Sequence, residues 1–140
     1  MTKKKILTSI FVVMLAIVVS VVMVMIIESK ETIPEIAADE VARVYYDDFA
    51  GNREKELEID QFLEYYSLIY DIKENKKGEG TTPESRIVIE MKDGSEICIY
   101  DQSTRFEVTF KNDDGEMKQY WGFQEEIYNM LRTGSYEGEN

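Results

Sequence analysis

Residues 86–100 read RIVIEMKDGSEICIY, and this stretch decides the fold of the chain beyond its N-terminal segment. Asp93 and Gly94 form a pair that is typical of a tight two-residue turn between antiparallel strands. Before the turn, Ile87 and Ile89 share one face, because the side chains of a strand alternate between its two sides. The stretch therefore predicts a β-hairpin with one apolar face, which another layer of structure must cover.

Two more strands follow this hairpin. Residues 106–110 alternate apolar and polar side chains, and residues 117–121 return after the segment 112–115, which reads NDDG and is typical of a turn. Together with the hairpin, these strands predict a four-stranded meander.

An earlier hairpin is predicted ahead of the meander. Residues 41–46 are β-branched and aromatic, Gly51 and Asn52 supply a turn, and residues 56–59 offer a shorter second strand. We expect the two strands to pair as a hairpin. A helix is the alternative upstream, where Thr32 could cap and Pro34 could start a turn that runs through residues 37–40.

Two amphipathic helices are also predicted. The first takes Asp60 as its N-cap, and the second ends at Gly134. The polar residues 73–83 predict a surface loop, which follows a brief strand through Ile72. The apolar stripes consist of Phe62, Leu63, Tyr66, Ile69 and Tyr70 in the first helix and of Phe123, Ile127, Met130 and Leu131 in the second.

The fold class that satisfies every apolar stripe is α+β. We expect an N-terminal transmembrane helix followed by an antiparallel sheet, built from the two-strand hairpin, a helix, the four-strand meander and a closing helix, with both helices on one face. A chain of 140 residues has room for one such domain. We assign it to residues 36–134, with residues 28–35 as a tether and residues 135–140 as a frayed tail.

The anchor is predicted at residues 6–27, where only Thr8, Ser9 and Ser20 are polar. At 1.5 Å per residue, a helix of this length spans roughly 33 Å, enough to cross the hydrocarbon core of a bilayer. The alternative is a cleaved signal peptide, but its apolar region is normally shorter and ends in a small-x-small cleavage site. The run therefore predicts an uncleaved single-pass helix in contact with membrane lipid.

The flanks of this run predict its orientation. Residues 1–5 carry three lysines and no acid, whereas residues 28–31 have no comparable basic excess. The positive-inside rule then places the N-terminus in the cytoplasm and the C-terminal domain outside the cytoplasmic membrane. The small residues Ser9, Ala16 and Ser20 fall on one side of the helix and suggest homodimerisation; the alternative is that they simply face lipid.

The predicted domain is strongly acidic. The whole chain has a formal net charge of −12, and from Glu31 onward 12 Lys and Arg stand against 27 Asp and Glu, a net charge of −15. Such a charge repels phosphate backbones and attracts cations. We therefore expect no nucleic-acid partner.

The residue types argue against most enzyme chemistry. The chain has no histidine, which removes the commonest general base and transition-metal ligand. No nucleophile elbow or phosphate loop is present, and the paired acids at 47–48, 113–114 and 125–126 are explained by strand ends, turns and a helix N-terminus. The single cysteine, Cys98, lies in an apolar strand and is expected to be buried. We expect a protein that is not an enzyme, with no cofactor and no specific metal site.

The aromatic residues give the one positive indication of function. Adjacent aromatic pairs in strands place one ring inside and one outside, and exposed rings suit a protein interface. We expect a non-enzymatic interaction or regulatory module that binds another envelope protein; the alternative is a sensor domain for a small ligand, a cationic peptide or a divalent ion. The candidate interaction residues are Tyr45, Tyr46, Tyr65, Tyr120 and Trp121.

The general plan resembles a known group of proteins. The Lys-Lys-Lys start, the strand-Asp-Gly-strand meander and the segment Gln119-Tyr120-Trp121 ahead of the last helix are similar to those of uncharacterised, small, membrane-anchored extracytoplasmic proteins of Gram-positive bacteria. The resemblance covers most of the chain and is architectural. It implies location and class, and it brings no activity or site residues.

Overall fold

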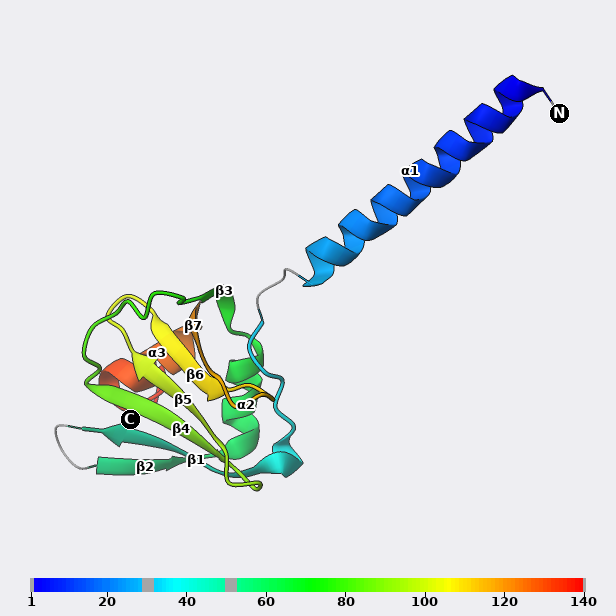
Figure 1. Ribbon diagram of the computed structural model, residues 1–140. Helices are drawn as coiled ribbons and strands as arrows, with labels where there is room; N and C mark the ends of the chain where they lie inside the picture. The colour runs from blue at the N-terminus through cyan, green and yellow to red at the C-terminus, as the bar shows by residue number, and fades with distance from the viewer. Residues whose placement is uncertain (1, 29–31, 50–52, 140) are drawn as a thin grey trace. The chain divides into compact units, whose positions relative to one another are not determined.

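The computed structural model describes residues 2–28, 32–49 and 53–139 (Figure 1). The chain divides into two compact units, residues 1–31 and residues 32–140. The first unit is a helix, and the second contains a sheet and two further helices. The predicted turn at Gly51 and Asn52 and the middle of the predicted tether, residues 29–31, lie outside the described residues.

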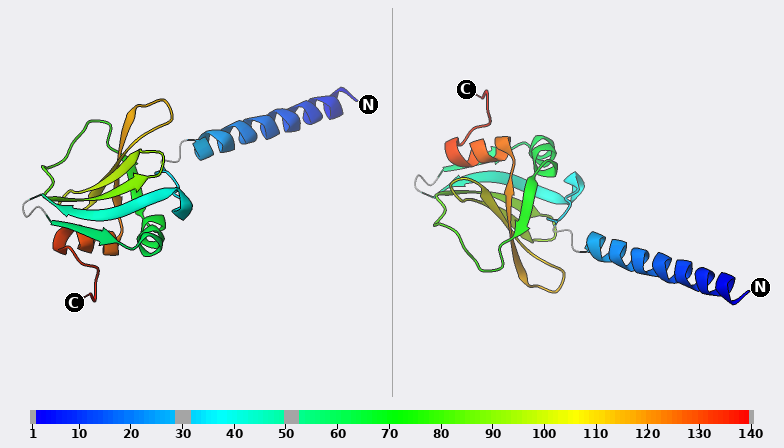
Figure 2. Two further views of the ribbon diagram at one scale, coloured as in Figure 1. Left: turned by 90° about the horizontal axis from the view of Figure 1, so that it is seen from below. Right: turned by 90° about the horizontal axis from the view of Figure 1, so that it is seen from above.

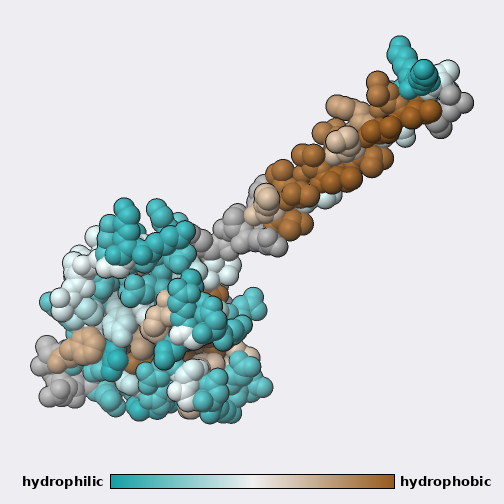
Figure 3. All heavy atoms as spheres, viewed as in Figure 1, coloured by the Kyte–Doolittle hydropathy of each residue, from teal (hydrophilic) through white to brown (hydrophobic). Residues whose placement is uncertain are grey.

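Helix α1 runs from Lys3 to Glu28 without a glycine or proline to interrupt it. Its described side chains are exposed all round, and Figure 3 shows them as one hydrophobic surface with a hydrophilic end. Thr8 and Ser20 donate their hydroxyls to the carbonyls of Lys4 and Ala16, at 2.9 and 2.8 Å, so neither hydroxyl needs water. The prediction of one N-terminal helix long and apolar enough to cross a membrane is confirmed.

The second unit is built on a sheet of seven strands in the order β2-β1-β4-β5-β6-β7-β3, with every neighbouring pair antiparallel. The predicted hairpin is β1 with β2, and the predicted meander is β4 to β7. The brief strand predicted through Ile72 is β3, which closes the far edge against β7. The strands are β1 (Val41–Asp48), β2 (Arg53–Leu57), β3 (Tyr70–Glu74), β4 (Ser85–Met91), β5 (Glu96–Asp101), β6 (Phe106–Lys111) and β7 (Met117–Phe123).

Helices α2 (Ile59–Ser67) and α3 (Glu125–Thr133) cover one face of this sheet, as predicted, and a short 3-10 turn, η1 (Ala38–Glu40), precedes β1. In both views of Figure 2 the helices lie on one side of the sheet, and the loop between β3 and β4 arches out on the other. Helix α3 ends at Gly134, as predicted, where φ is +76° and the amide donates to the carbonyl of Met130. The fold class, α+β with an N-terminal apolar helix, is confirmed.

The core fills the space between the helices and this covered face. Its fully buried side chains come from four strands and both helices, so no single element accounts for it. Arg132 in the last turn of α3 reaches Asp101 on β5, with 3.3 Å between Nη1 and Oδ2, and ties the helix to the sheet. The largest fully buried side chains are Phe62, Phe106, Ile87, Ile89, Ile99, Ile127, Met130, Val44, Val88 and Val108; all except Val88 belong to this core.

Several predicted boundaries are wrong by a few residues. Helix α2 is capped by Glu58 rather than Asp60, because the longer side chain folds back to accept from the amides of residues 60 and 61. The sequence predicts Tyr70 and Phe123 on the apolar stripes of helices, yet they lie across from each other in the β3–β7 pair, with ring centroids 5.7 Å apart. Both residues were assigned to the wrong type of element for one reason. A strand whose partner lies about 50 residues away in the sequence shows little local pattern that distinguishes it from a helix end.

The two ends of the predicted domain also differ from expectation. Ile33 and Ile36 pack against the core, and the Tyr66 hydroxyl donates to the carbonyl of Pro34 at 2.9 Å, so part of the predicted tether belongs to the folded unit. In the tail, Tyr136 is buried and its ring lies 5.0 Å from that of Tyr65. The tail is therefore anchored at this residue rather than frayed.

Candidate functional site

The aromatic residues predicted as an interaction patch do not come together. Tyr45 and Trp121 lie on the open face of the sheet, opposite the helices, whereas Tyr46 and Tyr120 lie on the covered face, so the strands do separate adjacent rings as expected. Tyr65 lies on α2 against the C-terminal segment. The five side chains therefore form no common surface.

Each of these rings is also packed against a neighbour. Tyr45 is only 7% exposed, and the Arg43 guanidinium lies 4.1 Å from its ring centroid. Trp121 is 6% exposed, with the Arg105 guanidinium 3.8 Å from its ring. Tyr46 is buried in the core, and Tyr120 stacks on Phe110 with 5.8 Å between centroids. Cation–π and stacking contacts of this kind occupy the ring faces that a partner would need.

The open face instead carries a row of polar and aromatic side chains, one from each strand between β1 and β3. Strand registers place these residues directly across from one another, so their side chains emerge on the same side. The row consists of Asp47, Arg86, Tyr100, Glu107, Trp121 and Lys73.

At the β1 end of this row, the charges of Arg86 and Asp47 neutralise each other. Arg86 donates from Nε to Asp47 Oδ2 at 3.1 Å and also interacts with the hydroxyl of Tyr100. Burial raises the pKa of the Tyr100 hydroxyl and of the neighbouring Cys98 thiol, which is buried as predicted. Both groups therefore stay protonated at neutral pH, and this end offers neither a thiolate nor a free cation.

The centre of the row opens into a hollow of about 360 Å³. Its floor is formed by β5, β6 and β7, and one wall is the loop that leads from β3 to β4. Seen from the loop side in Figure 3, most of this face of the domain is hydrophilic. The hollow is lined by Gly78, Glu79, Gly80, Thr81 and Pro83 of the loop and by Tyr100, Gln102, Glu107, Thr109 and Gln119 of the floor.

Two side chains fasten the loop above the floor. Asn75 donates from Nδ2 to the carbonyl of Glu79 at 2.6 Å and accepts from the amide of the same residue at 3.0 Å. Gln102 accepts from the amide of Thr81 at 2.7 Å and donates to its carbonyl at 3.0 Å. Between these points Gly80 has φ +151°, and a Cβ there would lie 2.6 Å from Gln102 Oε1, so only glycine fits. The wall of the hollow is thus held in place before any ligand arrives.

Glu107 lies at the bottom of the hollow and is only 8% exposed. Its Oε2 accepts from Asn75 Nδ2 at 2.8 Å, whereas Oε1 has only a contact of 3.5 Å with the Thr109 hydroxyl. Among the described residues, Glu107 makes no ion pair with a lysine or arginine. A buried carboxylate without a cation is unusual, because removing a charge from water is costly unless it is paired.

Comparison with protein-family models, with curated proteins and with solved structures finds no match to this chain. The chemistry of the site therefore has to come from its own residues. Within residues 2–28, 32–49 and 53–139, no three His, Cys, Asp or Glu side chains gather as metal ligands would. The hollow offers one buried carboxylate, hydroxyls and amides, a set suited to binding by hydrogen bonds and charge.

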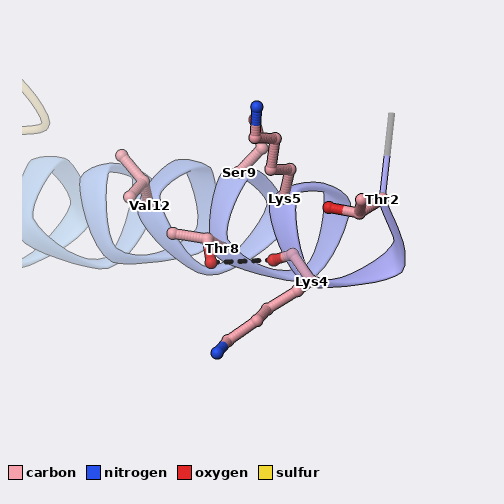
Figure 4. A pocket seen from close by; sticks show the side chains of 6 residues that line it. All are labelled: Thr2, Lys4, Lys5, Thr8, Ser9 and Val12. Carbon is pink, nitrogen blue, oxygen red and sulfur yellow. Dashed lines mark hydrogen bonds between the residues drawn. The ribbon is translucent and has the colours of Figure 1, made fainter.

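A second concavity lies on α1 itself, between side chains of its first three turns (Figure 4). Lys4 and Lys5 point to different sides of the helix there, and the Thr8 hydroxyl is already bonded to the Lys4 carbonyl. Because one exposed helix forms all of its walls, this concavity holds no converging groups and is not a candidate site.

Sequence reasoning missed the hollow, although part of its signal was present. Glu107 and Thr109 occupy the polar positions of the alternating strand at 106–110, which predicts that they share the side opposite the core. What the sequence could not supply is the position of Asn75 beside Glu107, which depends on the pairing of β3 with β7. Polar residues at alternate positions of an interior strand are the pattern that would have pointed here.

Proposed function

We propose that this protein is a single-pass membrane protein whose acidic domain lies outside the cytoplasm and serves as a non-enzymatic binding module. Three observations support the membrane location: the length of α1, its apolar surface on all sides, and the lysines at its start. The chain would then be a tethered receptor for a ligand or a partner side chain, with the hollow on the open face as its binding site.

The hollow is the observation that carries this proposal. A volume of about 360 Å³ falls in the range of small-ligand sites, and its wall is fixed in advance by Asn75 and Gln102. Preorganisation of this kind lowers the cost of binding. Aromatic docking has less support, because the large apolar side chains exposed among the described residues of the second unit lie in three separate stretches of the chain: Phe49, Leu68 with Tyr70, and Met117.

The membrane orientation can be tested with single cysteines in intact cells. A full-length chain carrying Cys98→Ala and Glu137→Cys is expected to react with a membrane-impermeant maleimide, because residue 137 is exposed in the domain. The matched chain with Cys98→Ala and Lys3→Cys is expected to react only after the cells are opened. The reverse pattern would place the domain in the cytoplasm and contradict this part of the proposal.

The binding role can be tested by site-specific photocrosslinking of the full chain in its own membrane. A benzoylphenylalanine in place of Gln119, on the floor of the hollow, is expected to give a discrete adduct after illumination. The same group in place of Glu64, an exposed residue on α2, is the control and should give none. Equal labelling at both positions, or none at either, would argue against a binding site on the open face.

A further inference from the structure

We infer that the hollow on the open face binds a protonated primary amine, with Glu107 as its counter-ion. This inference rests on the proposed function and deepens it by naming the class of ligand. The starting observation is that the two oxygens of the Glu107 carboxylate differ in their hydrogen bonds. Oε2 accepts from Asn75 at 2.8 Å, whereas among the described residues Oε1 has only the 3.5 Å contact with Thr109.

The surroundings of Glu107 favour a cation over any other ligand. The carboxylate is 8% exposed, lines the hollow, and has no lysine or arginine partner among the residues that the structure describes. An incoming cation would supply the missing ion pair in a site partly shielded from water, where charges attract more strongly. The net charge of −15 from Glu31 onward adds a long-range attraction for cations and repels anions.

The number and arrangement of acceptors select an ammonium group among cations. A divalent ion is usually held by several oxygen ligands that include carboxylates, and the described residues contain no group of three or more His, Cys, Asp or Glu side chains that could hold a metal ion. A guanidinium is best recognised by two carboxylate oxygens side by side, but Oε2 of Glu107 is already held by Asn75. An ammonium is a compact charge with three donors, for which one carboxylate oxygen and two neutral acceptors suffice.

Neutral acceptors of that kind are present beside Glu107. Thr109 and Gln119 lie directly across from each other on β6 and β7, and both line the hollow. The Gln119 side chain makes no hydrogen bond to another described residue, so its amide oxygen is free to accept. Tyr100 lines the side toward β5, so the carbon chain that bears the amine would lie against this side chain.

The test uses the full chain in nanodiscs of zwitterionic lipid, with n-butylamine as the probe near pH 7.5, where the amine is protonated. Trp121 is the only tryptophan of the chain and lies directly across from Glu107, so its fluorescence reports on the hollow. We expect a saturable change with n-butylamine and none with 1-butanol or butyrate at the same concentration. A similar response to 1-butanol would show that charge is not recognised and would overturn the inference.

Matched variants locate the counter-ion. Glu107→Gln is expected to weaken n-butylamine binding at least tenfold, whereas Glu64→Gln, with the same change in net charge on an exposed helix surface, should leave it within twofold. Binding to Glu107→Gln within twofold of the unmodified chain would overturn the inference. Should Glu107→Gln fail to fold, Gln119→Leu decides the matter, because it removes one neutral acceptor without breaking a hydrogen bond; about threefold weaker binding is expected, and unchanged binding would contradict the inference.

Two further ligands distinguish whether the bound amine belongs to a protein or to a small molecule. A lysine side chain is represented by acetyl-Gly-Lys-Gly-amide, and a free diamine by cadaverine. Tighter binding of the peptide identifies a protein lysine as the ligand, and tighter binding of cadaverine identifies a small molecule; either supports the inference. If no amine binds although the group at position 119 still gives a discrete adduct, the amine inference fails and the binding module stands. If no amine binds and the group at position 119 gives no adduct, both the amine inference and the proposed binding module fail.

Discussion

The two faces of the sheet are made by the same strands, yet they differ in almost every physical respect. The covered face packs Ile87, Ile89, Ile99 and Val108 at 0% exposure against two helices. The open face carries a small apolar cluster around Val88 and a row of polar and aromatic side chains, in which Arg86 pairs with Asp47. Apolar core packing and polar contacts are thus divided between alternate residues of each strand.

This division explains how the open face can carry Glu107, a buried carboxylate that makes no ion pair with a lysine or arginine among the residues that the structure describes. Burying apolar area contributes about 25 cal/mol per Å², so the covered face alone supplies most of the favourable term in folding. A buried polar group such as Glu107 then costs stability that the other face can offset. Variants on the two faces should therefore differ in both size and kind of effect.

The largest expected effect compares two neighbouring residues on β5. Ile99→Ala, on the covered face, should lower the free energy of unfolding by about 2–5 kcal/mol, because the surrounding residues relax only partly into the cavity that it leaves. Cys98→Ala, on the open face, should cost about 1 kcal/mol, because it removes one small group. Guanidinium unfolding of the full chain in detergent, followed by Trp121 fluorescence, measures both. Equal losses would mean that the open face is packed as tightly as the core.

An intermediate effect is expected where the loop is fastened over the open face. Asn75→Ala removes the donor to Glu107 and both bonds to Glu79, so it should cost about 1–3 kcal/mol by leaving a buried carboxylate with less support. The control is Asn112→Ala, which loses one bond to the amide of Glu116 in an exposed turn. The same unfolding measurement applies. If Asn75→Ala lowers the free energy of unfolding no more than Asn112→Ala does, water replaces the hydrogen bond from Asn75 to Glu107.

The smallest effect is a dependence on alkaline pH that belongs to the covered side. Burial raises the pKa of Tyr66 above its ordinary value of 10.0, so the folded state holds this proton more tightly than the unfolded state. The stability that this protonated hydroxyl contributes to the folded state is complete below pH 10. Above pH 10 the free energy of unfolding falls by up to about 1.4 kcal/mol per pH unit.

Unfolding curves between pH 9 and 11 test this dependence. Tyr66→Phe should flatten the decline in stability, even though losing the bond to Pro34 lowers stability at pH 7. An unaltered slope in Tyr66→Phe would assign the alkaline loss to other groups.

The contrast between the faces also marks what the sequence could predict. Alternation along 86–100, the Asp93-Gly94 turn and the stop at Gly134 are local signals, and the hairpin, the meander and the last helix follow from them. β3 was predicted only as a brief strand, and its pairing with β7 was not predicted, because Tyr70 continues the apolar spacing of the helix before it and its strand partner is distant in sequence.

The candidate site was harder to predict than the fold for the same physical reason. The aromatic residues were identified as a patch by residue type, but type alone does not tell which ring an arginine will cover; Arg105 over Trp121 is a contact of tertiary structure. Glu107 looked like an ordinary outward residue of a strand until the loop from β3 placed Asn75 above it. A site whose residues come from distant segments of the chain has no fixed residue spacing that could be recognised in the sequence.

The attachment of the segment before β1 has a mechanical consequence. The chain enters the folded unit through Ile33 and Pro34, held by the core and by Tyr66, and continues into β1, which is flanked by β2 and β4. Ladder bonds run perpendicular to the strands, so tension drawn along β1 loads the bonds on both sides together and does not open them one by one. A domain that is pulled from this end resists in shear, because a force reaching it through the tether enters β1, which is paired on both sides, and not the unpaired edge of a strand.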